Sequence, residues 1–236
     1  MTAHGLQQLI APTSLKNLQK LSASDKTIWQ AAYDEEYDGL FSIPTWEVIS
    51  EDEFKKLHKS VKPLPSMPIA SLEYDGNNKP KRAKYRIVVL GNLNYHVWSK
   101  ESTAAPVLSQ LELCLLTSSA IFHKKTLKNC DMKQAFVQSS LPSGEEYYVK
   151  PPVGCPCSAP GTYWRLIRSL YGLRCAPKLW FEKLSNHLKN MGLKSLASSP
   201  CLFVDTLIPG EPPMYVGMCE VDFMGQVSHF LEIEFN

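Results

Sequence analysis

The strongest constraint on the fold is a β-hairpin pattern in residues 61–92. Two runs rich in apolar and β-branched residues flank the turn sequence DGNN at 75–78, and the second run contains YRIVVL at 85–90. An Asp-Gly or Asn-rich turn between two such runs is a strong short-range signal for an antiparallel hairpin. The residues between the tip and the second strand are strongly basic: Lys79, Lys81, Arg82, Lys84 and Arg86. The sequence therefore predicts a basic β-hairpin.

Helical patterns alternate with further strand patterns along the chain. Ser24 or Asp25 could cap a helix whose apolar side runs to Leu40, with Pro44 beyond its end. Residues 109–122 are apolar and free of Gly and Pro, which predicts a mostly buried helix. Residues 176–192 show helical spacing and end at Gly192. Strand patterns lie in residues 126–131, 145–152, 162–170, 201–205 and 214–221.

The order of these segments indicates the fold class. They lack the regular βαβ alternation of a doubly wound sheet, and the chain has no Gly-rich phosphate loop. We therefore expect an α+β fold with an antiparallel sheet. With 236 residues, 44% of them hydrophobic, the chain can form one domain or two small lobes. Residues 1–23 lack a sustained period and are predicted to be a disordered linker, followed by a domain over residues 24–236.

Charge and cysteine content narrow the class of protein. A net charge of +2 is too small to indicate a nucleic-acid-binding protein by itself. Seven cysteines, an odd number, in a chain without a secretory leader are typical of reduced thiols, which predicts an intracellular protein of the cytoplasm, with the nucleus as an alternative. Cys155 and Cys157 form the one close pair, and no second pair completes a zinc site. No segment reaches the roughly 18 apolar residues of a membrane span.

Five sequence blocks carry a family resemblance. In order, they are residues 29–49 (WQAAYDEEYDGLFSIPTWEVI), 83–92 (AKYRIVVLGN), 105–107 (APV), 129–154 (NCDMKQAFVQSSLPSGEEYYVKPPVG) and 164–184 (WRLIRSLYGLRCAPKLWFEKL). Together they resemble the reverse transcriptase, an RNA-directed DNA polymerase, of Ty/copia-type long-terminal-repeat retrotransposons. The resemblance extends from Trp29 to the C-terminus.

This resemblance implies a right-hand polymerase fold consisting of palm and fingers, without a thumb or a ribonuclease H domain. It implies nucleotidyl transfer by two Mg²⁺ ions held by carboxylates, with an RNA template, a DNA primer and a deoxynucleoside triphosphate as partners. It implies no membrane association, and it leaves the oligomeric state open. We expect the domain to derive from a transposable element.

The resemblance also assigns candidate site residues. Asp131 matches the first metal-binding and catalytic acid, and Phe136 matches the aromatic residue that selects deoxynucleotides. Lys84 and Arg86 match residues that meet the triphosphate, whose oxygens suit an ammonium or a guanidinium group. Tyr171 and Gly172 match a backbone segment close to the nucleotide. The residues also have simpler interpretations that do not depend on the resemblance. Asp131 could be an exposed acid in a loop, and Phe136 could be an aromatic residue of the core. Lys84 and Arg86 could lie on a solvent-exposed strand face.

The end of the chain departs from the family at the second acid. Relatives carry Tyr-Val-Asp-Asp at a hairpin turn, and in an ungapped alignment of residues 219–222 only Asp222 matches one of the two acids, while Val221 stands at the place of the other. In a second alignment, FLEI at 230–233 matches a strand that lies well downstream in the family. We favour the second alignment, in which a deletion removed the hairpin and a central strand of the palm sheet. Glu220 and Asp222 could share a strand face, but such a pair does not reproduce two acids at a turn.

The sequence thus predicts a retrotransposon-derived reverse transcriptase domain that is catalytically inactive, a pseudoenzyme. Asp222 remains a candidate catalytic residue, although the favoured alignment places it outside the motif. Two alternatives stay open. The chain could be a nucleic-acid-binding remnant that uses the basic hairpin, or it could be an active polymerase whose motif was lost in the gene model.

Overall fold

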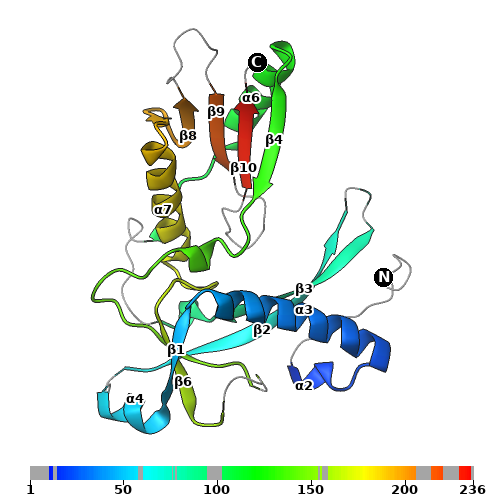
Figure 1. The fold of residues 1–236 in the computed structure, drawn as a ribbon, viewed down its shortest axis with the longest axis vertical. Coiled ribbons are helices and arrows are strands. Elements are labelled where there is room, and N and C mark those ends of the chain that lie inside the picture. Colours follow the sequence, from blue (N-terminus) through cyan, green and yellow to red (C-terminus); the bar gives the residue numbers. More distant parts are fainter. Residues whose placement is uncertain are drawn as a thin grey trace. The chain divides into compact units, whose positions relative to one another are not determined.

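The computed structural model describes residues 11–12, 15–57, 61–75, 77, 79–94, 103–153, 155, 159–205, 214–219 and 229–234. The chain forms two compact units, each built around a five-stranded sheet. Unit 1 comprises residues Met1–His96 and Ser140–Arg174, and unit 2 comprises Val97–Ser139 and Cys175–Asn236. Helices and largely antiparallel strands occur in both units (Figure 1), which confirms the predicted α+β class.

Unit 1 combines the N-terminal helices with strands from two parts of the chain. Its elements are α2 (Leu15–Leu18), α3 (Ala23–Ser42), β1 (Trp46–Ser50), α4 (Glu51–Leu57), β2 (Leu64–Tyr74), β3 (Pro80–Val89), the 3₁₀ helix η1 (Gly91–Leu93), β5 (Tyr148–Lys150) and β6 (Thr162–Leu166). The strand order is β1-β6-β5-β2-β3. Only the β2–β5 pair is parallel among the pairs of this sheet. β3 is therefore an edge strand whose single partner is β2.

The predicted hairpin is confirmed and is closed by Asp75. The Asp75 carboxylate accepts hydrogen bonds from the backbone N–H groups of Asn77 and Lys79, each 2.9 Å long. The Asp75 N–H also donates to the Lys79 carbonyl at 2.8 Å. β2 and β3 pair from Ser66 opposite Val89 to Glu73 opposite Arg82. The Asp side chain thus satisfies the turn backbone and fixes the register of the two strands.

Helix α3 packs along this hairpin (Figure 1). Ser22 is its N-cap and accepts a hydrogen bond from the Asp25 N–H, so the helix begins earlier than the predicted cap at Ser24 or Asp25. Trp29 and Tyr33 are buried on its inner side, and both make edge-on ring contacts with Tyr85 of β3, at centroid distances of 6.0 and 5.5 Å. This aromatic cluster joins α3 to the hairpin.

Unit 2 contains a second sheet, in the order β4-β10-β9-β8-β7. Its elements are α6 (Gln110–Phe122), β4 (Thr126–Asp131), η2 (Phe136–Gln138), α7 (Ala176–Asn190), β7 (Lys194–Leu196), β8 (Ser199–Asp205), β9 (Met214–Cys219) and β10 (His229–Glu234). All four strand pairs are antiparallel. The sheet is continuous in the described residues, because β10 pairs with β9 on one side and with β4 on the other; the deletion of a family strand stays a prediction.

Helix α7 agrees with its prediction, whereas helix α6 differs from its prediction in burial. In α7, Trp180, Leu184 and Leu188 are buried, and Gly192 follows the helix with φ +97°, as the predicted stop requires. Helix α6 forms where expected and begins with a capping box of Ser109 and Glu112. The prediction that α6 is mostly buried is wrong, because only Leu116 and Ala120 are buried in it.

Candidate functional site

Asp131 is the last residue of β4, as the sequence predicts. Its Cα lies opposite that of His229, the first residue of β10. β4 is an edge strand of the second sheet, so Asp131 stands at one corner of that sheet. Glu220 and Asp222, the other acids considered, lie outside the described residues, in the segment that joins β9 to β10.

The tetrapeptide Tyr215–Met218 in β9 reveals a feature that the sequence analysis missed. It begins with Tyr-Val, as the family motif does, but Gly217 and Met218 follow, so this stretch contains no acid. Met218 is fully buried. A Cβ atom on Gly217 would lie 3.0 Å from Leu108 and 3.4 Å from Leu116. These two positions are packed inside the unit and carry no carboxylate.

Phe136 opens η2, directly after the turn that follows β4. Its side chain is buried together with Ala135 and Val137. The end of η2 is held by α7, because the Lys183 ammonium group donates a hydrogen bond to the Gln138 carbonyl. The structure supports the interpretation of Phe136 as a core aromatic of unit 2.

Lys84 and Arg86 lie on one face of β3. The residues that alternate with them, Ala83, Tyr85, Ile87 and Val89, are buried. Since side chains alternate across a strand, Lys84 and Arg86 are on the opposite face, both partly exposed. Their partners across the hairpin are Ser71 and Ile69. The hairpin therefore presents an ammonium and a guanidinium group side by side on one face.

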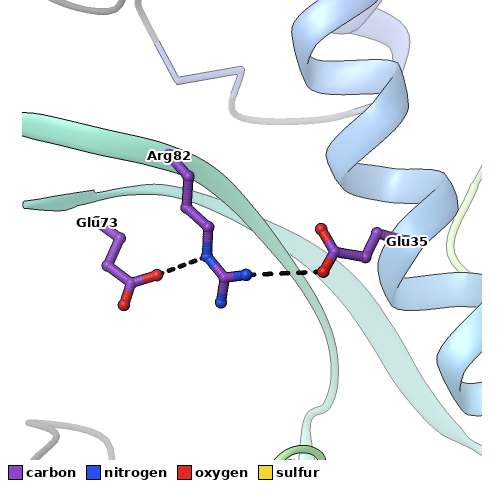
Figure 2. Close-up of polar contacts among 3 residues, drawn as sticks. All are labelled: Glu35, Glu73 and Arg82. Carbon is purple, nitrogen blue, oxygen red and sulfur yellow. Dashed lines mark hydrogen bonds and ion pairs between the residues drawn. The ribbon is translucent and has the colours of Figure 1, made fainter. Parts of the chain in front are cut away.

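Arg82 has a different role from its basic neighbours (Figure 2). Its Nε donates to the Glu73 carboxylate of β2 at 2.7 Å, and its terminal nitrogen lies 3.6 Å from the Glu35 carboxylate of α3. Partial burial raises the pKa of Glu73, but the Arg82 hydrogen bond and nearby positive charges outweigh burial and lower this pKa overall. Arg82 thus ties the hairpin to α3, and two carboxylates compensate its charge.

Tyr171 and Gly172 lie against the end of β3. The Val89 N–H donates a 2.7 Å hydrogen bond to the Tyr171 carbonyl. Gly172 has φ +89°, and a Cβ atom there would lie 1.9 Å from the Val89 carbonyl oxygen. The glycine is required by this close backbone approach within unit 1. The structure thus brings Tyr171 and Gly172 to the strand that carries Lys84 and Arg86.

The metal-binding capacity of the described residues is small. In the described parts of the chain, no three His, Cys, Asp or Glu side chains gather as a metal site requires. Cys155 is buried, and its sulfur accepts a hydrogen bond from the Tyr33 hydroxyl at 3.1 Å, whereas Cys157 lies outside the described residues. Among the helices described, none is both long and apolar enough to span a bilayer.

Two features of the structure bear on the class of protein. Each unit is an α+β fold with largely antiparallel strands, and strand β4 ends at Asp131, inside the sequence block 129–154. Residues 45–234, which are 190 of the 236 residues, match the family model described as "Reverse transcriptase (RNA-dependent DNA polymerase)". The chain belongs to this family.

The curated relatives are retrotransposon polyproteins. The chain is 28% identical over 193 residues to the retrovirus-related Pol polyprotein from transposon TNT 1-94 of Nicotiana tabacum, covering 81% of this chain and 14% of the relative. It is 24% identical over 176 residues to the polyprotein from transposon RE1 of Arabidopsis thaliana, covering 75% and 12%. It is 23% identical over 188 residues to the Ty1-LR2 Gag-Pol polyprotein of Saccharomyces cerevisiae, covering 78% and 10%. The chain therefore spans only about a tenth to a seventh of these relatives.

Proposed function

We propose that this chain is a retrotransposon-derived reverse transcriptase domain that retains its fold but does not catalyse DNA synthesis. Unit 1 serves as the fingers and unit 2 as the palm. The observation that carries the proposal is the identity and burial of Gly217 and Met218. A methionine and a glycine packed among apolar side chains offer no ligand to a hard cation.

The chemistry of nucleotidyl transfer explains why this loss is decisive. Two Mg²⁺ ions activate the primer hydroxyl and neutralise the triphosphate, and carboxylates from neighbouring strands must hold these ions close together against their mutual repulsion. Asp131 sits at the end of β4 and supplies one carboxyl group. The packed strand β9 supplies none at Gly217 or Met218, so among the residues that the structure describes the second half of the ligand set is missing.

The remaining site residues keep the properties needed to bind nucleotides or nucleic acid. In this proposal, Lys84 and Arg86 face the triphosphate, and Tyr171 and Gly172 form the turn beside them. Phe136 stays a core residue with a second role in sugar selection. An RNA template, a DNA primer and a deoxynucleoside triphosphate are the corresponding partners. An intracellular location, in the cytoplasm or nucleus, fits the reduced thiols of Cys114, Cys155, Cys175 and Cys201 among the described residues.

Primer extension tests the loss of catalysis. The purified chain is incubated with a DNA primer on an RNA template, all four deoxynucleoside triphosphates, and Mg²⁺ or Mn²⁺. We expect no extension above a reaction without protein. Template-dependent extension by the chain that Asp131→Ala abolishes would overturn the proposal.

The gene-model alternative has its own test. Sequencing the transcript across the codons for Met218 to Val221 shows whether an intron or frameshift correction removed the motif. We expect the transcript to encode the sequence as printed. A transcript that encodes two adjacent acids between Met218 and Val221 would restore the active-polymerase alternative.

Nucleic-acid binding by the hairpin is a second candidate function, favoured by the shared face of Lys84 and Arg86. Affinity for a short RNA should fall with salt, and replacing both residues with Gln should reduce the slope of log K against log[salt] by roughly two. The control is Lys55→Gln combined with Lys56→Gln on α4, which removes the same charge elsewhere in unit 1. Equal effects of the two double variants, or binding independent of salt, would exclude this function.

A further inference from the structure

Helix α6 exposes a continuous apolar face. The residues of this face are Leu111, Cys114, Leu115, Ser118, Ile121 and Phe122, all exposed. Their spacing of three and four residues places them along one side of the helix. Leu111 is 70% exposed, Leu115 61%, Ile121 74% and Phe122 81%. We call this set the α6 face.

The opposite side of α6 already packs on the sheet of unit 2. Leu116 lies close to Gly217 of β9, and Ala120 is completely buried. Helix α6 is thus apolar on both sides, whereas a surface helix of a globular protein normally carries charged residues on its outer side. Its one charged residue is Glu112, and the Glu112 carboxylate accepts hydrogen bonds from the Ser109 N–H and hydroxyl. The α6 face therefore carries no charge.

We propose that the α6 face binds the same face of a second copy of this chain, as an antiparallel helix pair with two-fold symmetry. An uncharged face offers nothing to a nucleic acid or an anionic lipid surface, whose binding depends on positive charge. Two copies of it meet without like-charge repulsion and are self-complementary, as a two-fold interface requires.

The residue spacing suits this arrangement. With the axis at the level of residues 116 and 117, Leu111 lies opposite the partner's Phe122, and Leu115 lies opposite the partner's Ser118. Large residues meet at both ends, and the small serine leaves room for the leucine near the centre. The inference is independent of the proposed function, because the α6 face contains none of the candidate site residues.

The exposed area is sufficient for a weak, specific dimer. At roughly 150–200 Å² for a fully exposed large apolar side chain, the four large residues would remove about 500 Å² per copy from water. Two copies then bury about 1,000 Å², the lower limit for a specific protein interface. We therefore expect a reversible dimer that dissociates on dilution.

Sedimentation velocity on the full chain, from about 1 to 100 µM, tests the proposal. Wild type should shift from monomer to dimer over this range. Leu115→Glu should stay monomeric throughout, since it places a charge at the centre of both faces. Met191→Glu is the matched control: Met191 is also an exposed apolar residue of unit 2, just after α7, and its replacement should leave the dimer unchanged. Circular dichroism and thermal melts verify that each variant is folded.

Several results would overturn the proposal. These are a wild type that is monomeric at every concentration, a dimer that persists in Leu115→Glu, equal loss in Met191→Glu, and growth beyond a dimer into open-ended assemblies. If Leu115→Glu does not fold, Phe122→Glu at the exposed end of the helix replaces it, with the same expected result. For Phe122→Glu, the dissociation constant of the dimer should be at least tenfold higher than for wild type.

Discussion

Gly91 lies directly against the carbonyl group of Gly172, so that a Cβ atom on Gly91 would stand 2.3 Å from the Gly172 oxygen. The atoms that such a Cβ would meet belong to the backbone of Gly172 and Leu173, so no flexible side chain could move away to make room. The contact joins the end of β3 to a turn about 80 residues later in the chain. It fixes the turn of Tyr171 and Gly172 beside the strand that carries Lys84 and Arg86.

The first prediction concerns a second close approach in the same turn, that of Gly172 to the Val89 carbonyl. Gly172→Ala should lower the free energy of unfolding by more than about 3 kcal/mol, because the new Cβ meets the Val89 carbonyl oxygen at 1.9 Å. Gly144→Ala is the control: Gly144 also has positive φ, +91°, but has open space around it. It should cost only about 1–2 kcal/mol of backbone strain. Denaturant unfolding measures both, and equal losses would contradict the packing role.

The second prediction concerns the Arg82–Glu73 pair and pH. Because the folded-state pKa of Glu73 is lowered, the pair stabilises the fold above the ordinary glutamate pKa of 4.5, and this stabilisation is lost as pH falls through the lowered value. Both side chains are partly exposed, so Arg82→Gln should cost at most about 1 kcal/mol at pH 7. A double-mutant cycle with Glu73→Gln should give a coupling energy that vanishes once the pH falls below the lowered pKa of Glu73. A coupling energy unchanged by acid would contradict this account.

The third prediction concerns two thiols of unit 2. Burial, with a smaller effect of the Glu112 carboxylate, raises the pKa of Cys201 to about 12, whereas Cys114 is exposed. Thiolates are the reactive form, so Cys201 should react slowly with a disulfide reagent at pH 8. In the Leu115→Glu background, which leaves the α6 face uncovered, Cys114→Ser should remove one fast-reacting thiol and Cys201→Ser none. Loss of a fast thiol in Cys201→Ser would refute the prediction.

The fourth prediction concerns Met218. Introducing an acid there should not give catalysis, because Met218 is fully buried and Met218→Asp would place an unpaired carboxyl group in the core. The expected loss of stability is roughly 3–5 kcal/mol. Met191→Asp, at an exposed methionine, should change stability by no more than about 0.5 kcal/mol. A stable Met218→Asp protein with Mg²⁺-dependent primer extension would show that this position faces an active site.

Local patterns predicted much of the fold correctly. The hairpin of β2 and β3 depends on a turn and two short runs, and helix α7 depends on its own periodicity and Gly192, so both were predictable from neighbouring residues. The position of Asp131 at the end of β4 likewise followed from one short segment.

Features that depend on distant residues were not predictable. The sequence did not predict the continuity of the second sheet, because β10 inserts between β9 and β4, a pairing that only the folded sheet reveals. Helix α6 was expected to be buried because its composition is apolar all round, yet the described chain covers only one side of it. Arg82 resembles its basic neighbours in sequence, and its partner Glu35 lies 47 positions earlier.

The most direct test of the central claim, that the chain lacks the paired carboxylate site of a polymerase, is Mn²⁺ binding measured by electron paramagnetic resonance. The titration uses the full chain with a primer–template and a deoxynucleoside triphosphate, and compares wild type with Asp131→Asn. We expect the same weak Mn²⁺ binding in both proteins, after the Mn²⁺ bound by the nucleotide alone is subtracted. Tight binding of two Mn²⁺ ions that Asp131→Asn abolishes would contradict it.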